Sequence, residues 1–284
     1  MSVDLPTGIS RTTHPMPGVL IQTEACTGLV LDQGAHILSW APSGQAEVLF
    51  TSDRAVFTAG KAIRGGIPVC WPWFDSGKEG QAPVRHGFAR TADWRLVDAS
   101  VTDGVATIAH ELTGFDVNTH GFPTDVVARL EAEFGAELVV RLVVTAGAEP
   151  VEFEEALHTY LAVDEISKVR IEGLDGDDYL DTVGEPTQRT QTGEITFDGE
   201  LDRVYSSTAQ AVLVDGERTI TVGKQNSRTT VVWNPGPELA GTMQDLGADQ
   251  ARVFCCVETA NAKEHAVTLQ PGERHAMVAT YRVG

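Results

Sequence analysis

The sequence predicts an all-β fold, a large antiparallel β-sandwich with few short helices. Apolar and polar residues alternate with a period of two in several segments, most clearly in Val126–Phe134 and Glu137–Thr145. Gly, Pro, Asp and Ser interrupt the chain at the short intervals typical of turns between strands. A helical period is absent from most of the chain, and the best helical candidate, Pro237–Leu246, is short.

The expected strands follow one another along the chain with brief interruptions. They are predicted at Gly18–Thr23, Thr27–Asp32, His36–Trp40, Glu47–Phe50, Val105–Leu112, Val126–Phe134, Glu137–Thr145, Lys168–Gly173, Ala211–Asp215, Thr219–Gly223 and Thr229–Trp233. Gly135-Ala136 predicts a two-residue hairpin turn. Leu174–Glu185 is acidic and turn-rich, which favours a surface loop, and His265–Gln270 with Arg274–Arg282 is expected to close the chain as a hairpin.

The composition predicts one domain over residues 1–284. No Ser/Gly tract, Pro-rich spacer or charge block marks a linker, and 42% hydrophobic residues suffice for a sizeable core. No apolar run approaches the roughly 20 residues of a membrane span, and the N-terminus has neither the basic nor the apolar region of a signal peptide. The four cysteines form no CxxC pair. We therefore expect a reduced, cytoplasmic compartment.

The net charge of the chain and its local distribution indicate which kinds of binding partner are favoured. The formal net charge of −19 disfavours nucleic acid and anionic membranes. The stretch Lys61–Arg95, however, carries six basic and three acidic residues, a local balance of +3. It is rich in Gly, Pro and Trp, so it cannot form a long helix or strand, yet its apolar residues require burial. We interpret it as an ordered wall of a site for a small anionic ligand, because arginine forks suit phosphate or carboxylate. The alternative, solvated or surface-paired arginines, is about equally favoured for any single residue.

Three motifs in this stretch resemble a known family. Ile63-Arg64-Gly65-Gly66-Ile67-Pro68, Trp71-Pro72-Trp73-Phe74 and His86-Gly87-Phe88-Ala89-Arg90 are similar to segments of the hexose-6-phosphate mutarotases, or glucose-6-phosphate 1-epimerases. These enzymes belong to the aldose 1-epimerase, or galactose mutarotase-like, superfamily. The resemblance extends from Ile63 to Asn261 and implies the supersandwich form of the β-sandwich.

Val151–Val163 is the second stretch with chemical content. As one strand, it would place Phe153 and Leu157 on an apolar face and His158 in mid-strand on the other face, among carboxylates. A lone histidine there is more often structural than functional. The phrase Ala156-Leu157-His158-Thr159-Tyr160, however, resembles the family segment that carries the catalytic histidine.

Two further segments match the family. Arg252–Glu258 is predicted as a strand that ends in Glu258, and Cys256-Val257-Glu258 resembles the segment that supplies the catalytic glutamate. Asp202-Arg203-Val204-Tyr205 resembles a short motif whose aspartate contributes to the substrate site. Without the resemblance, a solvated strand edge would be the simpler interpretation of Glu258, and an exposed residue before a strand that of Asp202.

The resemblance implies acid–base interconversion of sugar anomers with no cofactor and no metal. Glu258 would remove the proton of the C1 hydroxyl, and His158 would protonate the ring oxygen. Neighbouring Glu152 or Glu154 is expected to keep His158 protonated.

The resemblance also implies a substrate-binding set made of Arg64, Arg85, His86, Arg90 and Asp202. The arginines would face the 6-phosphate, and His86 and Asp202 the sugar hydroxyls. Arg85 stands where many relatives carry Gln, and its added charge is expected to affect phosphate binding or selectivity.

Two alternatives remain open. A mutarotase for unphosphorylated aldoses would not need the arginines, and a non-catalytic carbohydrate-binding β-sandwich would not need an acid–base pair. P-loop, GxGxxG, HExxH and GxSxG motifs are absent from the sequence. We expect a monomer that acts on a phosphosugar.

Overall fold

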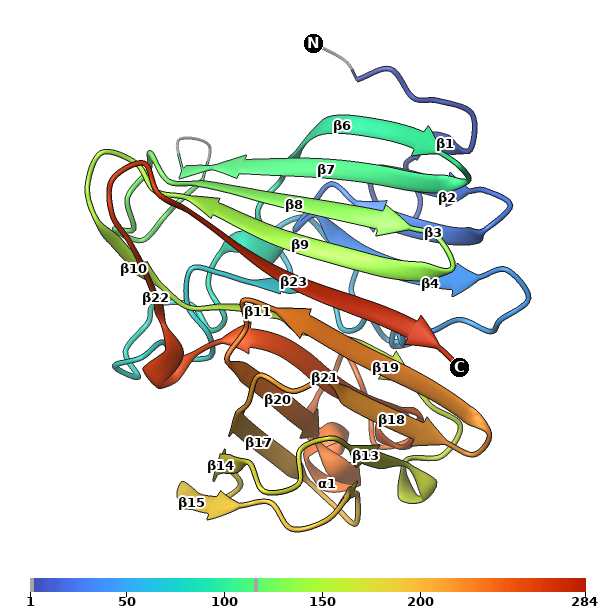
Figure 1. The fold of residues 1–284 in the computed structure, drawn as a ribbon, viewed down its shortest axis with the longest axis vertical. Helices are drawn as coiled ribbons and strands as arrows, with labels where there is room; N and C mark the ends of the chain where they lie inside the picture. The colour runs from blue at the N-terminus through green and yellow to red at the C-terminus, as the bar shows by residue number, and fades with distance from the viewer. Residues whose placement is uncertain (1–2, 115–116) are drawn as a thin grey trace.

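Antiparallel sheets dominate the computed structural model, which describes residues 3–114 and 117–284 (Figure 1). The largest sheet has nine strands: β6 (Arg95–Thr102), β7 (Val105–Thr113), β8 (Val127–Phe134), β9 (Glu137–Thr145), β13 (Arg170–Glu172), β16 (Ile195–Thr196), β18 (Ala211–Asp215), β19 (Arg218–Gln225) and β23 (Arg274–Val283). They are ordered β16-β13-β18-β19-β23-β9-β8-β7-β6, so the late strand β23 joins the two halves of the sheet.

Three smaller sheets accompany it. The first contains, in order, β1 (Ile9–Thr12), β2 (Gly18–Gln22), β3 (Cys26–Leu31) and β4 (His36–Pro42). The second contains β5 (Val69–Cys70), β11 (Glu155–Leu157), β12 (Tyr160–Ala162), β14 (Asp178–Asp181), β15 (Thr187–Thr190), β17 (Leu201–Ser206), β20 (Thr229–Asn234) and β21 (Phe254–Asn261). Its order is β15-β14-β17-β20-β21-β11-β5, with β12 also paired to β21. β10 (Val151–Phe153) and β22 (Val267–Leu269) form a separate pair.

Helices are short and few in the described part of the chain. The α-helix α1 spans Gly236–Thr242, and single 3-10 turns span Ala89–Thr91 (η1), Ile166–Lys168 (η3), Ala251–Val253 (η4) and Lys263–His265 (η5). No helix within residues 3–114 and 117–284 has the length and apolarity to cross a membrane. The predicted all-β class is confirmed, and the helix predicted at Pro237–Leu246 begins one residue earlier and ends at Thr242.

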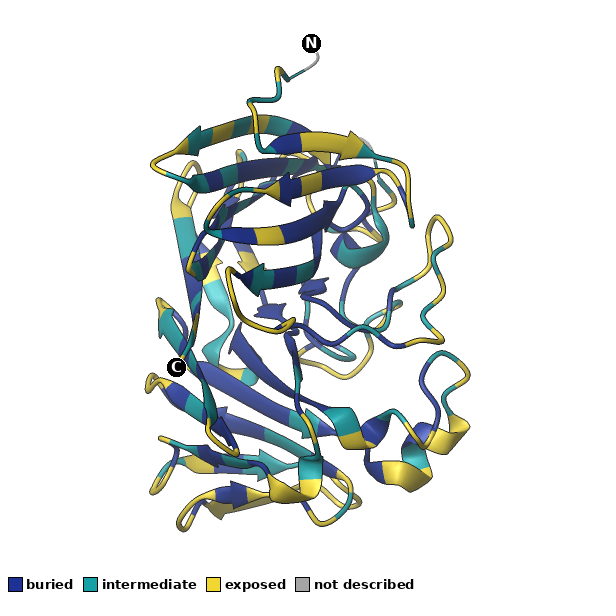
Figure 2. Cartoon of the chain, turned by 90° about the vertical axis from the view of Figure 1, so that its right-hand side faces the viewer, coloured by how far each residue is buried: buried dark blue, intermediate teal, exposed yellow. Residues whose placement is uncertain are grey.

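Alternating burial explains how the layers pack. In β8, each second residue is buried, as the period-two pattern predicts. Buried and more exposed residues likewise alternate along several strands in Figure 2. On one half of the large sheet, Trp40 of β4 donates its indole N–H to the carbonyl of Gly135, 3.1 Å away. On the other half, Thr159 forms a 2.5 Å hydrogen bond with Tyr281 of β23. The smaller sheets therefore cover the large one, and the core lies between them.

The prediction of one strand over Val151–Val163 is wrong. This stretch divides into β10, β11 and β12, each in register with a different partner segment. The break between β11 and β12 falls at His158 and Thr159, where the Thr159 N–H bonds to the carbonyl of Leu157 instead of a neighbouring strand. His158 is consequently not in mid-strand. The predicted apolar face is confirmed, since Phe153 and Leu157 lie in the main core together with Leu161 and Val163.

The prediction of a strand at Glu47–Phe50 is also wrong, because this segment makes only isolated bridges. The Glu47 carboxylate accepts the backbone N–H groups of Trp40, Val48 and Leu49 at 2.8–3.1 Å. These are donors that a regular ladder would otherwise pair with carbonyls.

Two predictions about chain ends and loops need correction. The predicted loop Leu174–Glu185 contains strand β14, which is held between β15 and β17 although its composition is acidic. The predicted C-terminal hairpin does not form, because β22 pairs with β10 while β23 pairs with β9 and β19.

The turn of the β8–β9 hairpin and the end of strand β21 differ in detail from the predictions. The β8–β9 hairpin is confirmed, but Phe134 pairs with Leu138, so three residues and not two form its turn. Glu258 lies in the middle of β21 and not at its end.

Candidate active site

A cavity of about 650 Å³ lies against the β17–β20–β21 part of the eight-stranded sheet and beside segment 61–95. The seven residues predicted as catalytic or substrate-binding all line it: Arg64, Arg85, His86, Arg90, His158, Asp202 and Glu258. The structure thus brings together side chains that are up to 194 positions apart in the sequence.

Segment 61–95 has a fixed path although it contains little regular structure. Gly65 and Gly66 have φ of +126° and +63°, and a Cβ on Gly65 would lie 2.4 Å from the Thr51 Cα. The buried His36 ring holds the segment through a 2.8 Å hydrogen bond between Nε2 and the Gly65 carbonyl. The expectation of an ordered wall is confirmed.

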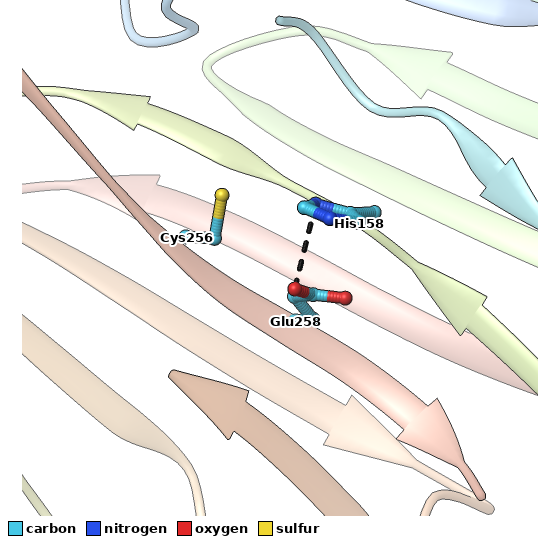
Figure 3. Close-up of side chains that lie close together, drawn as sticks. All are labelled: His158, Cys256 and Glu258. Atoms are coloured by element: carbon cyan, nitrogen blue, oxygen red, sulfur yellow. Dashed lines mark ion pairs between the residues drawn. The ribbon is translucent and has the colours of Figure 1, made fainter. Parts of the chain in front are cut away.

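His158 sits at the break between β11 and β12, with its backbone N–H bonded to the carbonyl of Pro68 in segment 61–95. Its ring stacks on the Tyr160 ring at 4.9 Å between centroids and meets the Trp233 ring edge-on at 5.8 Å. This packing fixes the plane of the imidazole. It presents Nδ1 to Glu258, whose Oε1 is 3.4 Å away (Figure 3).

Glu258 projects from β21 among buried residues and is itself 1% exposed. Its Oε2, like His158 Nδ1, is a buried polar atom without a hydrogen-bond partner among the described residues. Burial first, and the negative charge of Asp202 second, raise the pKa of Glu258 well above its usual range. A buried, unpartnered carboxyl beside a histidine is a candidate functional group.

The pKa of His158 moves in the opposite direction. Burial is the largest cause, and the charges of His86, Arg90 and Arg64 also lower it well below the usual histidine value. The expectation that Glu152 or Glu154 keeps His158 protonated is therefore wrong. Glu152 pairs with Lys78 at the surface. The buried Glu154 carboxylate instead accepts two backbone N–H groups, from Phe74 and Lys263.

Cys256 lies beside the pair, two residues before Glu258 on the same side of β21 (Figure 3). His158, Cys256 and Glu258 each have one donor atom within 4.8 Å of the others, a set that zinc accepts in other proteins. Cys256 does not line the cavity and packs with Tyr160 and Phe254. Because His158 and Glu258 do line it, we interpret them as an acid–base pair with a neighbouring buried thiol.

The three arginines differ in their partners. Arg64 binds the Asp245 carboxylate at 3.2 Å and donates to the Tyr160 hydroxyl at 3.1 Å. Arg85 is 71% exposed and pairs with Asp75 through its Nε at 2.7 Å, so the charge that it adds to the cavity is partly neutralised. Arg90 donates to the Arg85 carbonyl, and its Nε is buried without a partner among the described residues.

His86 and Asp202 complete the predicted set. His86 has φ of +62°, and its Nδ1 accepts the backbone N–H of Asp75 at 3.3 Å, which leaves Nε2 as a donor. Burial, with the charges of Arg90 and Arg85, lowers the pKa of His86 to about 2. Burial raises the pKa of Asp202 to about 6, and Asp75 adds to this effect. Both side chains can therefore form hydrogen bonds to hydroxyl groups.

Several lining residues were not predicted. Trp233, near the end of β20, is one of them. Asp75, Met243 and Lys263 also face the cavity, and no local pattern distinguished them. They line one cavity only because segments that are far apart in the sequence border it.

Known proteins resemble this chain over most of its length. An aldose 1-epimerase family model matches residues 18–282. A protein of Escherichia coli (strain K12), named "Putative glucose-6-phosphate 1-epimerase", is 40% identical over 82% of this chain and 79% of its own. A protein of the same name from Cenchrus ciliaris is 33% identical over 95% of this chain and 84% of its own.

Solved structures agree with these relatives. The crystal structure of "a putative mutarotase (YeaD)" from Salmonella typhimurium has a TM-score of 0.92 at 30% identity and covers 100% of this chain and 96% of its own. A galactose mutarotase-like protein from Clostridium acetobutylicum, at 14% identity, shares the fold with a TM-score of 0.76. The fold is thus the galactose mutarotase-like β-sandwich that the sequence motifs implied. The chain belongs to the aldose 1-epimerase family.

Proposed function

We propose that this protein interconverts the α and β anomers of a hexose 6-phosphate of the glucose 6-phosphate type. One observation carries the proposal: a buried histidine–glutamate pair, 3.4 Å apart, faces a cavity that four cationic side chains line. The names of the E. coli and C. ciliaris relatives support the same activity.

The reaction requires two proton transfers. Glu258 removes the proton of the C1 hydroxyl while His158 protonates the ring oxygen, the ring opens to an aldehyde, and C1–C2 rotates. Closure reverses both transfers and delivers the other anomer. Both groups are side chains of this chain, so we propose no cofactor and no metal.

Burial determines where the proton shared by Glu258 and His158 resides. Since the pKa of Glu258 is raised and that of His158 is lowered, the pair shares one proton, which rests on the carboxyl before substrate binds. Transfer of this proton to Nδ1 makes a carboxylate base and an imidazolium acid in one step. That imidazolium then donates its Nε2 proton to the ring oxygen of the sugar. Only the singly protonated pair is active, so we expect a bell-shaped pH–rate profile.

The remaining predicted residues hold the substrate in this proposal. Arg64 and Arg90 bind the phosphate through charge-assisted hydrogen bonds. His86 donates to a sugar hydroxyl through Nε2, and Asp202 accepts from another. Arg85 has a smaller part, because Asp75 offsets its charge.

The two alternatives lack a supporting observation of this kind. A cavity for an unphosphorylated sugar would gain little from four cations. A non-catalytic carbohydrate-binding module would have no use for a buried, unpartnered carboxyl next to a histidine.

We further propose that the protein acts as a cytoplasmic monomer. The four cysteines are free and buried, as a reducing compartment would leave them. Size-exclusion chromatography with light scattering would test the monomer, since a stable dimer would contradict it.

Anomer exchange measured by NMR tests the function. We expect the protein to accelerate exchange of glucose 6-phosphate far more than that of glucose. Equal acceleration of both sugars would favour the unphosphorylated-aldose alternative. Binding of either sugar without acceleration would favour the non-catalytic module.

A further inference from the structure

A lysine outside the predicted set occupies the cavity wall. Lys263 follows β21 after a single intervening residue and lines the same cavity as His158 and Glu258. Its φ is +59°, a left-handed backbone conformation that residues other than glycine adopt at an energetic cost. Such strain persists where neighbouring contacts hold the residue in place, and at sites it often serves to aim a side chain.

Glu154 supplies the contact that holds Lys263. One carboxylate oxygen accepts the Lys263 backbone N–H at 2.7 Å, and the other accepts the Phe74 N–H at 3.1 Å. Glu154 is 3% exposed, and its own N–H bonds to the Pro72 carbonyl at 2.9 Å. One buried carboxylate therefore connects segment 61–95 to the turn that carries Lys263.

The charges of the cavity divide into two classes. Arg64 and Arg85 have carboxylate partners, Asp245 and Asp75. Arg90 and Lys263 form no ion pair with any residue that the structure describes. The Lys263 ammonium is close enough to contribute to the low pKa of His86. An anion that enters this cavity gains most from cations that are not already neutralised.

We propose that Lys263 binds the substrate phosphate together with Arg90, and that Glu154 is the positioning residue that directs Lys263 into the cavity. This inference rests on the proposed function and extends it, because it assigns the recognition of the phosphorylated sugar to two segments and not to the arginines of segment 61–95 alone. The ammonium acts as a point charge that follows the phosphate, in contrast to the fixed arginine forks.

Replacement of Lys263 tests the phosphate contact. We expect Lys263→Met to raise KM for glucose 6-phosphate by about 10- to 100-fold, the usual effect of losing a hydrogen bond to a charged group, with kcat nearly unchanged. Lys263→Arg should restore most of the affinity. Lys168→Met removes an exposed lysine of η3 and serves as the matched control. An unchanged KM in Lys263→Met, or an equal loss on free glucose, would overturn the contact.

The positioning role of Glu154 has its own test. Glu154→Gln keeps only one acceptor oxygen for two backbone N–H groups, so it should raise KM for glucose 6-phosphate in the wild-type background. In the Lys263→Met background the same change should have little further effect. A merely structural Glu154 would instead reduce activity by the same factor in both backgrounds, which would refute the positioning role.

A measurement independent of turnover separates this inference from the proposed function. Titration of each variant with inorganic phosphate, followed by ³¹P NMR, reports anion binding alone. If the wild type accelerates neither sugar, the proposed function fails. Loss of phosphate binding in Lys263→Met but not in Lys168→Met would still support the lysine site, and retained binding would reject it.

Discussion

Strand β21 and segment 61–95 contribute to the same cavity through opposite kinds of construction. All eight residues of β21 are buried, and the strand pairs with β20 on one side and with β11 and β12 on the other. Segment 61–95 contains one two-residue strand and is fixed by glycine conformations, by His36 and by backbone bonds to other segments.

The two kinds of construction suit different parts of the proposed function. The sheet removes Glu258 from water and raises the pKa of its carboxyl, as the proposed proton transfer requires. The segment brings Arg64 and Arg90 to the cavity without burying them in a ladder, which suits recognition of a charged substrate. Changes in β21 should therefore affect kcat, and changes in segment 61–95 should affect KM or stability.

Glu258→Gln should have the largest effect. It keeps the shape of the side chain but removes the base, so we expect kcat for glucose 6-phosphate to fall by about 10²- to 10⁴-fold with KM little changed, as measured by NMR exchange. Glu152→Gln is the matched control, because Glu152 is an exposed carboxylate paired with Lys78. A Glu258→Gln enzyme with wild-type kcat would show that this carboxyl is not the base.

Arg64→Ala should come next and should discriminate between substrates. We expect KM for glucose 6-phosphate to rise by about 10- to 100-fold, because a charge-assisted contact is lost, while any activity on free glucose stays the same. Arg54→Ala removes a half-exposed arginine that is paired with Asp249 and provides the control. Equal losses on both sugars would contradict a phosphate role for Arg64.

Gly65→Ala should destabilise segment 61–95 without removing a charged group. The new Cβ would lie 2.4 Å from the Thr51 backbone at a φ of +126°, so we expect a loss of at least about 2 kcal/mol in the free energy of unfolding. Gly44→Ala, also at positive φ but with open space around it, should cost only about 1 kcal/mol. Urea denaturation measures both, and equal losses would show that segment 61–95 tolerates a shift at Gly65.

His36 should make the anchoring of segment 61–95 sensitive to acid. Burial lowers the pKa of His36 from 6.5 to about 4 in the folded protein. Between these values the unfolded chain binds a proton that the folded chain does not, so stability falls as the pH falls from 6.5 to 4.

The expected contribution of His36 is a loss of about 2 kcal/mol between pH 7 and pH 5. His36→Gln can still donate to the Gly65 carbonyl but does not titrate. Its free energy of unfolding, measured by urea denaturation at both values of pH, should decline less than that of the wild type. Parallel declines would show that other groups cause the acid sensitivity.

The sequence by itself determined the fold class and identified seven residues that line one cavity. Period-two alternation is a local property, and it identified strands such as β8 and β9 because each of their buried faces repeats within a few residues. The motifs around Arg64, Arg90, His158 and Glu258 were recognisable because they are contiguous, and all of these residues line one cavity.

Only the tertiary structure decided how these residues are arranged and what surrounds them. Whether a carboxylate neighbouring in sequence reaches a histidine depends on where the chain bends, and the break at His158 directs Glu154 toward Phe74 and Lys263 instead. The proton balance of the pair likewise follows from burial between sheets, which a period-two pattern does not reveal. Lys263 reaches the cavity through a single left-handed residue held by a carboxylate 109 positions away. Such contacts join segments distant in sequence, so no local pattern encodes them.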